Sequence, residues 1–121
     1  MDTIAEIFDL RGKTAIVTGG GKGIGRAISN RLAEAGAAVM IADIDLEAAT
    51  KAVQSIREKG GKAEATKCDV SVAAEARKTV EATVQTFGDV HILVNNAGVY
   101  PGRMFLELMT TSNSTVPTWY A

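Results

Sequence analysis

Five glycines follow an apolar run near the start of the sequence, within Thr18-Gly19-Gly20-Gly21-Lys22-Gly23-Ile24-Gly25. The run before them, Ala15-Ile16-Val17, is typical of a buried strand, and the apolar spacing after them is typical of a helix. A strand that ends in glycines and continues as a helix presents bare backbone amides to a diphosphate. This segment therefore predicts that the chain holds a dinucleotide.

The glycines are spaced as T-G-x-x-x-G-x-G and not as the generic fingerprint G-x-G-x-x-G. We expect the same function from them: Gly19 permits a tight turn, Gly23 lets the backbone approach phosphate, and Gly25 lets the helix pack close to the strand. A plain glycine-rich turn is the alternative, but the strand before it, the helix after it and an acid farther on favour phosphate binding. A P-loop is excluded, because no Gly-Lys-Ser/Thr follows at the required spacing.

An acid that could bind a ribose, Asp43, lies 18 residues after Gly25, at the end of the second apolar run. In dinucleotide-binding folds an acid about 20 residues beyond the glycines accepts hydrogen bonds from the adenosine ribose. Its carboxylate would repel a 2′-phosphate, so Asp43 favours NAD over NADP as the cofactor. Lys22 weakly favours NADP, since its ammonium group could pair with a 2′-phosphate. The alternative interpretation of Lys22 is a solvated lysine of the loop.

The elements that must position these residues alternate from residue 13 onward. Each crossover is long enough for a helix, which predicts parallel strands joined by right-handed connections. We therefore expect an α/β fold: a Rossmann-type, three-layer α/β/α arrangement with an incomplete doubly wound parallel sheet. The expected domains are a dinucleotide-binding domain over 1–108 and an irregular tail over 109–121. The expected strands cover 14–18, 38–42, 62–68 and 90–94, and the helices run over 23–36, from 46 to the glycines at 60 and 61, and from an N-cap at Ser71 to near Gly88.

Composition narrows the classes of partner. The 121 residues fit one domain, and the net charge of −1 with scattered basic residues favours neither nucleic acid nor an anionic membrane. The one cysteine, Cys68, cannot form a disulfide within the chain, which suits the cytoplasm. The first ten residues lack the pattern of a signal peptide, and no apolar run reaches bilayer length. No cluster has metal-ligand spacing, so we expect no metal.

Four motifs together resemble the N-terminal half of a short-chain dehydrogenase/reductase of the main, single-domain type. They occur in the order of that family, at successive strand ends, and the resemblance covers about residues 8–108. It implies an NAD(P)-dependent oxidoreductase that transfers a hydride between nicotinamide and an alcohol or carbonyl substrate. The motifs are Thr18-Gly19-(x)3-Gly23-Ile24-Gly25, Ala42-Asp43, Asp69-Val70 and Asn95-Asn96-Ala97-Gly98.

The resemblance also implies roles for single residues. Asp69 should bond the adenine amino group with Val70 beside the ring, and Ile24 should touch the nicotinamide side. The segment from Asn95 to Gly98 should line the cofactor and brace the central strands. Taken alone, Asp69 could be a helix-start acid, the asparagines a strand-ending turn, and Cys68 a small buried hydrophobe. The predicted binding set is Gly19, Gly21, Lys22, Gly23, Ile24, Gly25, Asp43, Ile44, Cys68, Asp69, Val70, Asn95, Asn96, Ala97 and Gly98.

The catalytic residues of the family have no counterpart in these 121 residues. The family uses a Tyr with a Lys four residues later, whereas Met104 follows Tyr100 at that spacing and only Ala121 follows Tyr120. Ser112 and Ser114 come too soon after the fourth strand to match the catalytic serine. We therefore predict no catalytic residue, and a small alcohol or carbonyl as substrate only if the missing half completes the site.

Two alternatives to an active enzyme follow. The chain could be a truncated, non-catalytic nucleotide-binding fragment, or a pairing partner of a full-length paralogue; self-association would use the exposed edge of the sheet. A frameshift near Met109 is the hypothesis for the truncation, because a shifted reading frame from that codon can encode a sequence similar to the next helix of the family.

Overall fold

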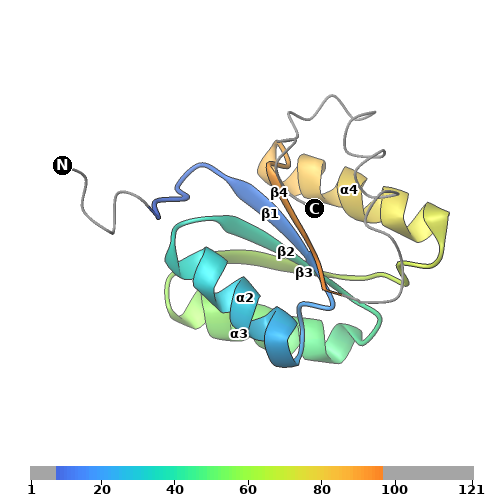
Figure 1. Cartoon of the computed structure of the whole chain (residues 1–121), viewed down its shortest axis with the longest axis horizontal. Helices are drawn as coiled ribbons and strands as arrows, with labels where there is room; N and C mark the ends of the chain where they lie inside the picture. Colours follow the sequence, from blue (N-terminus) through green and yellow to red (C-terminus); the bar gives the residue numbers. More distant parts are fainter. Residues whose placement is uncertain (1–7, 97–121) are drawn as a thin grey trace.

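Strands and helices alternate strictly along residues 8–96, which are the residues that this computed structural model describes (Figure 1). The predicted elements are all present, and the predicted tail over 109–121, like the domain boundary at residue 108, lies outside the described residues. The elements are β1 (Thr14–Thr18), α2 (Gly23–Glu34), β2 (Ala38–Asp43), α3 (Leu46–Glu58), β3 (Lys62–Lys67), α4 (Ala73–Phe87) and β4 (Ile92–Asn95).

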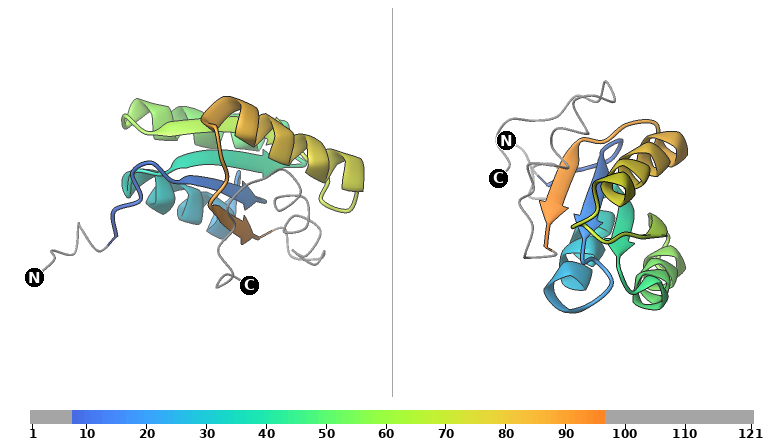
Figure 2. Two further views of the ribbon diagram at one scale, coloured as in Figure 1. Left: turned by 90° about the horizontal axis from the view of Figure 1, so that it is seen from above. Right: turned by 90° about the vertical axis from the view of Figure 1, so that its right-hand side faces the viewer.

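The four strands form one parallel sheet in the order β3-β2-β1-β4. Figures 1 and 2 show α2 and α3 together on one face of the sheet and α4 on the other. The helix between each two consecutive strands crosses over a face of the sheet, as a parallel arrangement requires, so the predicted Rossmann-type α/β fold with three layers is confirmed. β4 forms an edge of the described sheet.

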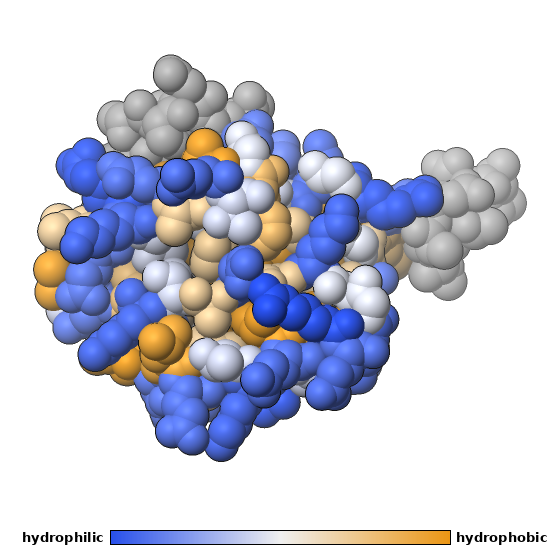
Figure 3. All heavy atoms as spheres, turned by 180° about the vertical axis from the view of Figure 1, so that it is seen from behind, coloured by the Kyte–Doolittle hydropathy of each residue, from blue (hydrophilic) through white to orange (hydrophobic). Residues whose placement is uncertain are grey.

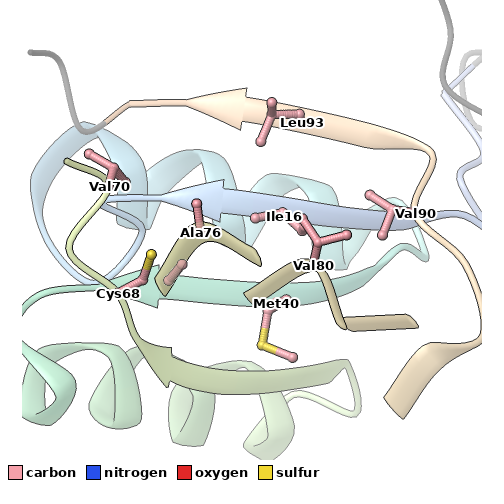
Figure 4. Packing of buried hydrophobic residues seen from close by; sticks show 9 residues of the cluster. Ile16, Met40, Cys68, Val70, Ala76, Val80, Val90 and Leu93 are labelled. Carbon is pink, nitrogen blue, oxygen red and sulfur yellow. The ribbon is translucent and has the colours of Figure 1, made fainter. Parts of the chain in front are cut away.

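Both faces of the two central strands are buried, which explains their unbroken apolar sequences. On the α4 side, Leu93, Ile16 and Met40 stand in register across three strands, beneath Ala76 and Val80 of the helix (Figure 4). The next residues along the strands point to the opposite face and pack against α2 and α3; this second cluster contains Val17, Val39, Ile41, Ala49, Ala52, Val53 and Ile56. Each large aliphatic side chain buried in this way contributes about 1.5–3 kcal/mol to the free energy of unfolding.

The start of the fourth strand differs from the prediction. It begins at Ile92 and not at residue 90, because Thr14 is the first residue of β1 and Ala15 already pairs with Ile92. His91 meets the beginning of β1 in another way: its backbone N–H donates to the Thr14 carbonyl, and its Nδ1 accepts from the Thr14 N–H at 3.0 Å. His91 is thus a structural residue of the sheet edge.

The surface contains both hydrophilic and hydrophobic residues. Seen from behind, hydrophilic residues cover much of it, with hydrophobic residues exposed between them (Figure 3). Among residues 8–96, none of the helices combines the length and apolar character needed to cross a bilayer. Within residues 8–96, the large hydrophobic residues with exposed side chains are Phe8, Ile24, Ile44, Leu46 and Val72, and four of these five follow the carboxyl ends of strands.

Candidate cofactor-binding site

The segments after the four strands meet at one edge of the sheet, because the strands are parallel and their carboxyl ends coincide. This edge gathers the glycine loop after β1, Asp43 at the end of β2, Asp69 after β3 and the asparagines at the end of β4. The fold therefore brings together the predicted binding residues that lie within 8–96. Ala97 and Gly98 of the predicted set lie outside the described residues.

Three positions of the glycine loop require glycine, because of backbone conformation or lack of space. Gly19 and Gly23 adopt positive φ angles of 64° and 54°, which other residues adopt only with strain. A Cβ on Gly25 would lie 2.1 Å from the Gly19 carbonyl oxygen and 2.6 Å from Nδ2 of Asn96, so only glycine fits there. The helix therefore approaches the loop itself and Asn96, and not the strand as expected from the sequence. Ser29 of α2 is fully buried and donates from Oγ to the Gly25 carbonyl at 2.9 Å.

The amino end of α2 is open. Its N-cap residue is Lys22, which forms no side-chain cap bond within the described residues, and its first turn contains no acid. The first amides of a helix have no intrahelical partner, and they carry partial positive charge. Together with the space that the glycines leave beside the loop, these amides fit the phosphates of a dinucleotide.

Asp43 is bonded to the glycine loop. Its side chain is buried (8% exposed); Oδ2 accepts from the Gly21 N–H at 3.0 Å, and Oδ1 accepts from the Asp45 N–H at 3.0 Å. The carboxylate therefore holds the loop against the end of β2. Each carboxylate oxygen retains a second lone pair, so the predicted bond to ribose hydroxyls remains possible in chemical terms and stays a prediction.

Lys22 forms an ion pair in the folded chain, although its side chain remains largely exposed. Its Nζ lies 2.8 Å from Oδ2 of Asp45, and this contact raises the pKa of Lys22 and, together with the Ala48 amide, lowers that of Asp45. Asp45 also caps α3, because its Oδ1 accepts from the Ala48 N–H at 3.1 Å. Asp45 is absent from the predicted binding set. Its place directly before the apolar spacing of α3 is the signal that identifies it as an N-cap residue.

The loop after β3 is organised around Asp69. Its Oδ1 accepts from both the N–H and the Oγ of Ser71, at 3.0 and 2.6 Å, and these bonds lower the pKa of Asp69. The prediction that Ser71 caps α4 is therefore wrong. The Ser71 hydroxyl donates to the Asp69 carboxylate, and the N-cap position is occupied by Val72, which forms no side-chain bond. Glu75 in the first turn instead accepts from the Asp69 N–H at 3.0 Å. The contact of Asp69 with adenine stays a prediction.

Cys68 and Val70, on either side of Asp69, are buried in the cluster beneath α4 (Figure 4). Burial raises the pKa of the Cys68 thiol, which agrees with the interpretation of this residue as a small buried hydrophobe. A cofactor contact of these two residues would therefore involve the backbone more than the side chains, and it also stays a prediction.

The asparagines after β4 are bonded to β1 and to its loop. The buried Thr18 hydroxyl donates to Oδ1 of Asn95 at 3.0 Å and accepts from the Asn96 N–H at 3.0 Å. Nδ2 of Asn96 donates to the Gly19 carbonyl at 3.3 Å. These bonds join the end of β4 to the end of β1 at the glycine loop. Contact of the asparagines with a cofactor stays a prediction.

No group of three His, Cys, Asp or Glu side chains within residues 8–96 is placed to hold a metal ion. The carboxyl edge instead presents backbone amides, carboxylates and exposed apolar side chains. Those apolar residues include Ile24 and Ile44, both of which belong to the predicted binding set. The amides are suited to the anionic part of a ligand, and the apolar side chains are suited to an aromatic part.

The parallel sheet and its glycine loop define a Rossmann-type nucleotide-binding fold, and comparison with known proteins identifies the family. A family model described as short chain dehydrogenase matches residues 13–116. The chain belongs to the short-chain dehydrogenase/reductase family.

Individual relatives agree with this assignment. An uncharacterized oxidoreductase of Methylorubrum extorquens is 52% identical over 92 residues, which are 75% of this chain and 37% of the relative. A solved short chain dehydrogenase/reductase from Burkholderia phymatum in complex with NAD is 34% identical, with a TM-score of 0.68 over 70% of this chain and 30% of that one. A 7α-hydroxysteroid dehydrogenase complexed with NADH and 7-oxo glycochenodeoxycholic acid is 29% identical, with a TM-score of 0.84 over 96% of this chain and 55% of that one. The chain spans only about 35–41% of the length of the curated relatives it matches.

Proposed function

We propose that the carboxyl edge of the sheet binds the adenosine and diphosphate part of NAD, and that the whole protein transfers a hydride between nicotinamide and an alcohol or carbonyl. The observation that carries the binding proposal is the pairing of an open helix end with an acid. The glycine loop leads into the uncapped amino end of α2, and the same loop is bonded through Gly21 to the buried Asp43. One ligand with adjacent diphosphate and ribose groups would use both features.

Each part of the ligand has a partner of suitable chemistry. The first amides of α2 would donate to the diphosphate, and the Asp43 carboxylate would accept from the ribose hydroxyls. The lowered pKa of Asp69 keeps that side chain an ionised acceptor, as a bond from the adenine amino group requires. The exposed side chain of Ile44, between Asp43 and Asp45, would provide an apolar wall for the adenine ring.

The same geometry supports NAD over NADP. Asp43 is buried against the loop, so its negative charge is poorly screened, and a 2′-phosphate beside it would be repelled. NAD carries a hydroxyl at that position and would donate a hydrogen bond instead. The two solved relatives complexed with NAD or NADH support dinucleotide binding, and the preference itself rests on Asp43.

The nicotinamide ring supplies the chemistry when it is bound, by giving or accepting a hydride. The residues of this chain would bind and orient the cofactor, and none of the 121 residues matches the Tyr, Lys and Ser of the family. We therefore expect this chain to bind dinucleotide without measurable turnover of alcohols or ketones. A cytoplasmic location, supported by the single cysteine, and self-association through the β4 edge are further proposals.

Calorimetry of NAD and NADP binding to the purified chain tests the proposal. The expected result is saturable binding of NAD that is tighter than binding of NADP. The matched variant Asp43→Asn keeps the size of the side chain but removes its charge, and it should narrow the difference between the two cofactors. A chain that circular dichroism shows to be folded, and that binds neither cofactor at millimolar concentration, would contradict the proposal.

A further inference from the structure

A hollow of about 460 Å³ opens beside the glycine loop, between the first turns of α2 and α3. Side chains of both charges line it, the cations being Lys22, Arg26 and Lys51 and the acids Asp45 and Glu47. Lys22 is paired with Asp45 at 2.8 Å, and Lys51 with Glu47 at 3.4 Å. The hollow therefore contains cations that could attract a phosphate, but its two lysines are already neutralised.

The Lys22–Asp45 pair adjoins the acid that would hold the ribose. Asp43 accepts from the backbone N–H of Gly21, which precedes Lys22, and from the backbone N–H of Asp45 itself. A group attached to a ribose at Asp43 would therefore lie beside this ion pair. In NADP that group is the 2′-phosphate, and in NAD it is a hydroxyl.

We propose that Asp45 helps to set the cofactor preference, by holding Lys22 in an ion pair that a 2′-phosphate would have to break. This inference rests on the proposed dinucleotide site and adds to it a second determinant besides Asp43. Asp45 is a positioning residue in this scheme: it acts on the cofactor through Lys22.

The two partners of the pair differ in freedom. Asp45 is fixed, because its other oxygen caps α3 through the Ala48 N–H. The side chain of Lys22 is 66% exposed and flexible, so it is the partner that would move toward a phosphate. If it did, Asp45 would be left unpaired and close to a second anion. Loss of the pair and repulsion by the bare carboxylate therefore both weaken NADP binding, and neither acts on NAD.

The size of the effect follows from the exposure of the pair. Ion pairs at the surface are weak and screened by salt. Asp45 should therefore change the preference several-fold and should not decide it alone. The buried Asp43 remains the stronger determinant.

The experiment measures NAD and NADP binding by calorimetry for the 121-residue chain and for Asp45→Asn, with adenosine 2′,5′-bisphosphate and 5′-AMP as a matched pair that lacks nicotinamide. Asparagine caps a helix as well as aspartate does, so α3 should keep its first turn. Asp45→Asn should raise the affinity for NADP and for the bisphosphate by about three- to tenfold, and should change the affinities for NAD and AMP by less than about twofold. Asp45→Ser, a second uncharged cap, should give the same result.

Two controls separate the ion pair from net charge. In a Lys22→Ala background, Asp45→Asn should raise NADP affinity by less than about twofold, because only the repulsion by the carboxylate is then removed. Glu47→Gln removes an acid from the same hollow but releases Lys51 in place of Lys22, and it should leave the NADP-to-NAD ratio nearly unchanged.

The outcomes distinguish this inference from the proposed function. If NAD binds and neither Asp45 variant improves NADP binding, the role of Asp45 is overturned and the dinucleotide site stands. An equal gain from Glu47→Gln, or an undiminished gain in the Lys22→Ala background, overturns it as well. If the folded chain binds no nucleotide, the role of Asp45 and the proposed function both fail.

Discussion

The amino ends of α2 and α3 lie next to each other at the carboxyl edge of the sheet, but their first turns are built differently. α3 begins with Asp45, which accepts from the Ala48 N–H, and has Glu47 in its first turn. α2 begins with Lys22, without a side-chain cap bond in the described part of the chain and without an acid in its first turn. Uncapped amides lower the stability of a helix unless another group bonds to them. α3 thus bonds the Ala48 amide of its first turn to its own N-cap residue, whereas α2 has no such side-chain bond within residues 8–96.

α4 shows that a missing cap alone does not make a binding site. Val72 at its N-cap also forms no side-chain bond, but Glu75 places a carboxylate in the first turn, where it bonds to the Asp69 N–H. That negative charge would repel a phosphate. Among the three helices of residues 8–96, only α2 combines a missing side-chain cap bond, a first turn without an acid and a preceding loop of glycines.

The largest effect on NAD binding and on stability should come from displacing the glycine loop that precedes α2. In Gly25→Ala, the added Cβ would overlap the Gly19 carbonyl oxygen and the Asn96 amide, so the loop must move. We expect NAD binding to be lost and the free energy of unfolding to fall by about 2–3 kcal/mol, measured by calorimetry and urea denaturation. Gly23→Ala is the control: its Cβ meets nothing within 4 Å, and only the positive φ should cost about 1 kcal/mol. Equal stability of Gly25→Ala and the parent chain would contradict the packing described for the loop.

The second-largest effect should come from substitution of Asp43. Its carboxylate bonds both the glycine loop before α2 and the N-cap residue of α3. Asp43→Ala leaves the N–H groups of Gly21 and Asp45 without their acceptor. We expect NAD affinity to fall at least about tenfold and the unfolding free energy by about 1–3 kcal/mol. Asp43→Asn retains one acceptor oxygen, so its NAD affinity and its unfolding free energy should lie between those of Asp43→Ala and the parent chain. If Asp43→Ala binds NAD as the parent chain does, Asp43 does not shape the site.

A smaller change would make α2 resemble α3. Lys22 already has the extended backbone of an N-cap, so Lys22→Ser should place a hydroxyl on the first amides of the helix. Thermal unfolding should shift upward by about 2–4 °C while NAD affinity falls about threefold, since cap and phosphate would compete for the same donors. Lys22→Ala loses the same ion pair without adding a cap, and it should show no upward shift. Stability and binding that rise together in Lys22→Ser would contradict the competition.

The smallest effect concerns the cap of α3 and its dependence on pH. The pKa of Asp45 is lowered in the folded chain by Lys22 and by the Ala48 amide. Its stabilising contribution is therefore fully present above the ordinary aspartate pKa, and it is lost as the pH falls through the lowered value. The difference in urea midpoint between the parent chain and Asp45→Asn should narrow below pH 4 or so. A difference that is constant down to pH 2 or so would contradict the ionic contribution.

The sequence predicted the fold more completely than the contacts of the site. Apolar runs place β1 and β2 because both of their faces are buried, and the glycines mark where the loops must turn. The sequence does not show the bond between Asp43 and Gly21 or the pair between Lys22 and Asp45, because their partners are more than twenty residues apart and meet only in the folded sheet. The wrong prediction of an N-cap at Ser71 has a similar origin. The local rule considers only the residue type and its position before the helix, whereas in the fold the Ser71 hydroxyl donates to Asp69.

The bond between Asp43 and Gly21 means that the glycine loop depends on a residue outside its own strand–helix unit. A peptide from β1 to the end of α2 would contain every glycine of the loop. It would lack the Asp43 carboxylate that holds the loop in place, because Asp43 belongs to the following strand, β2. Transplanting the loop into another strand–helix unit would accordingly require grafting a carboxylate onto the neighbouring strand as well.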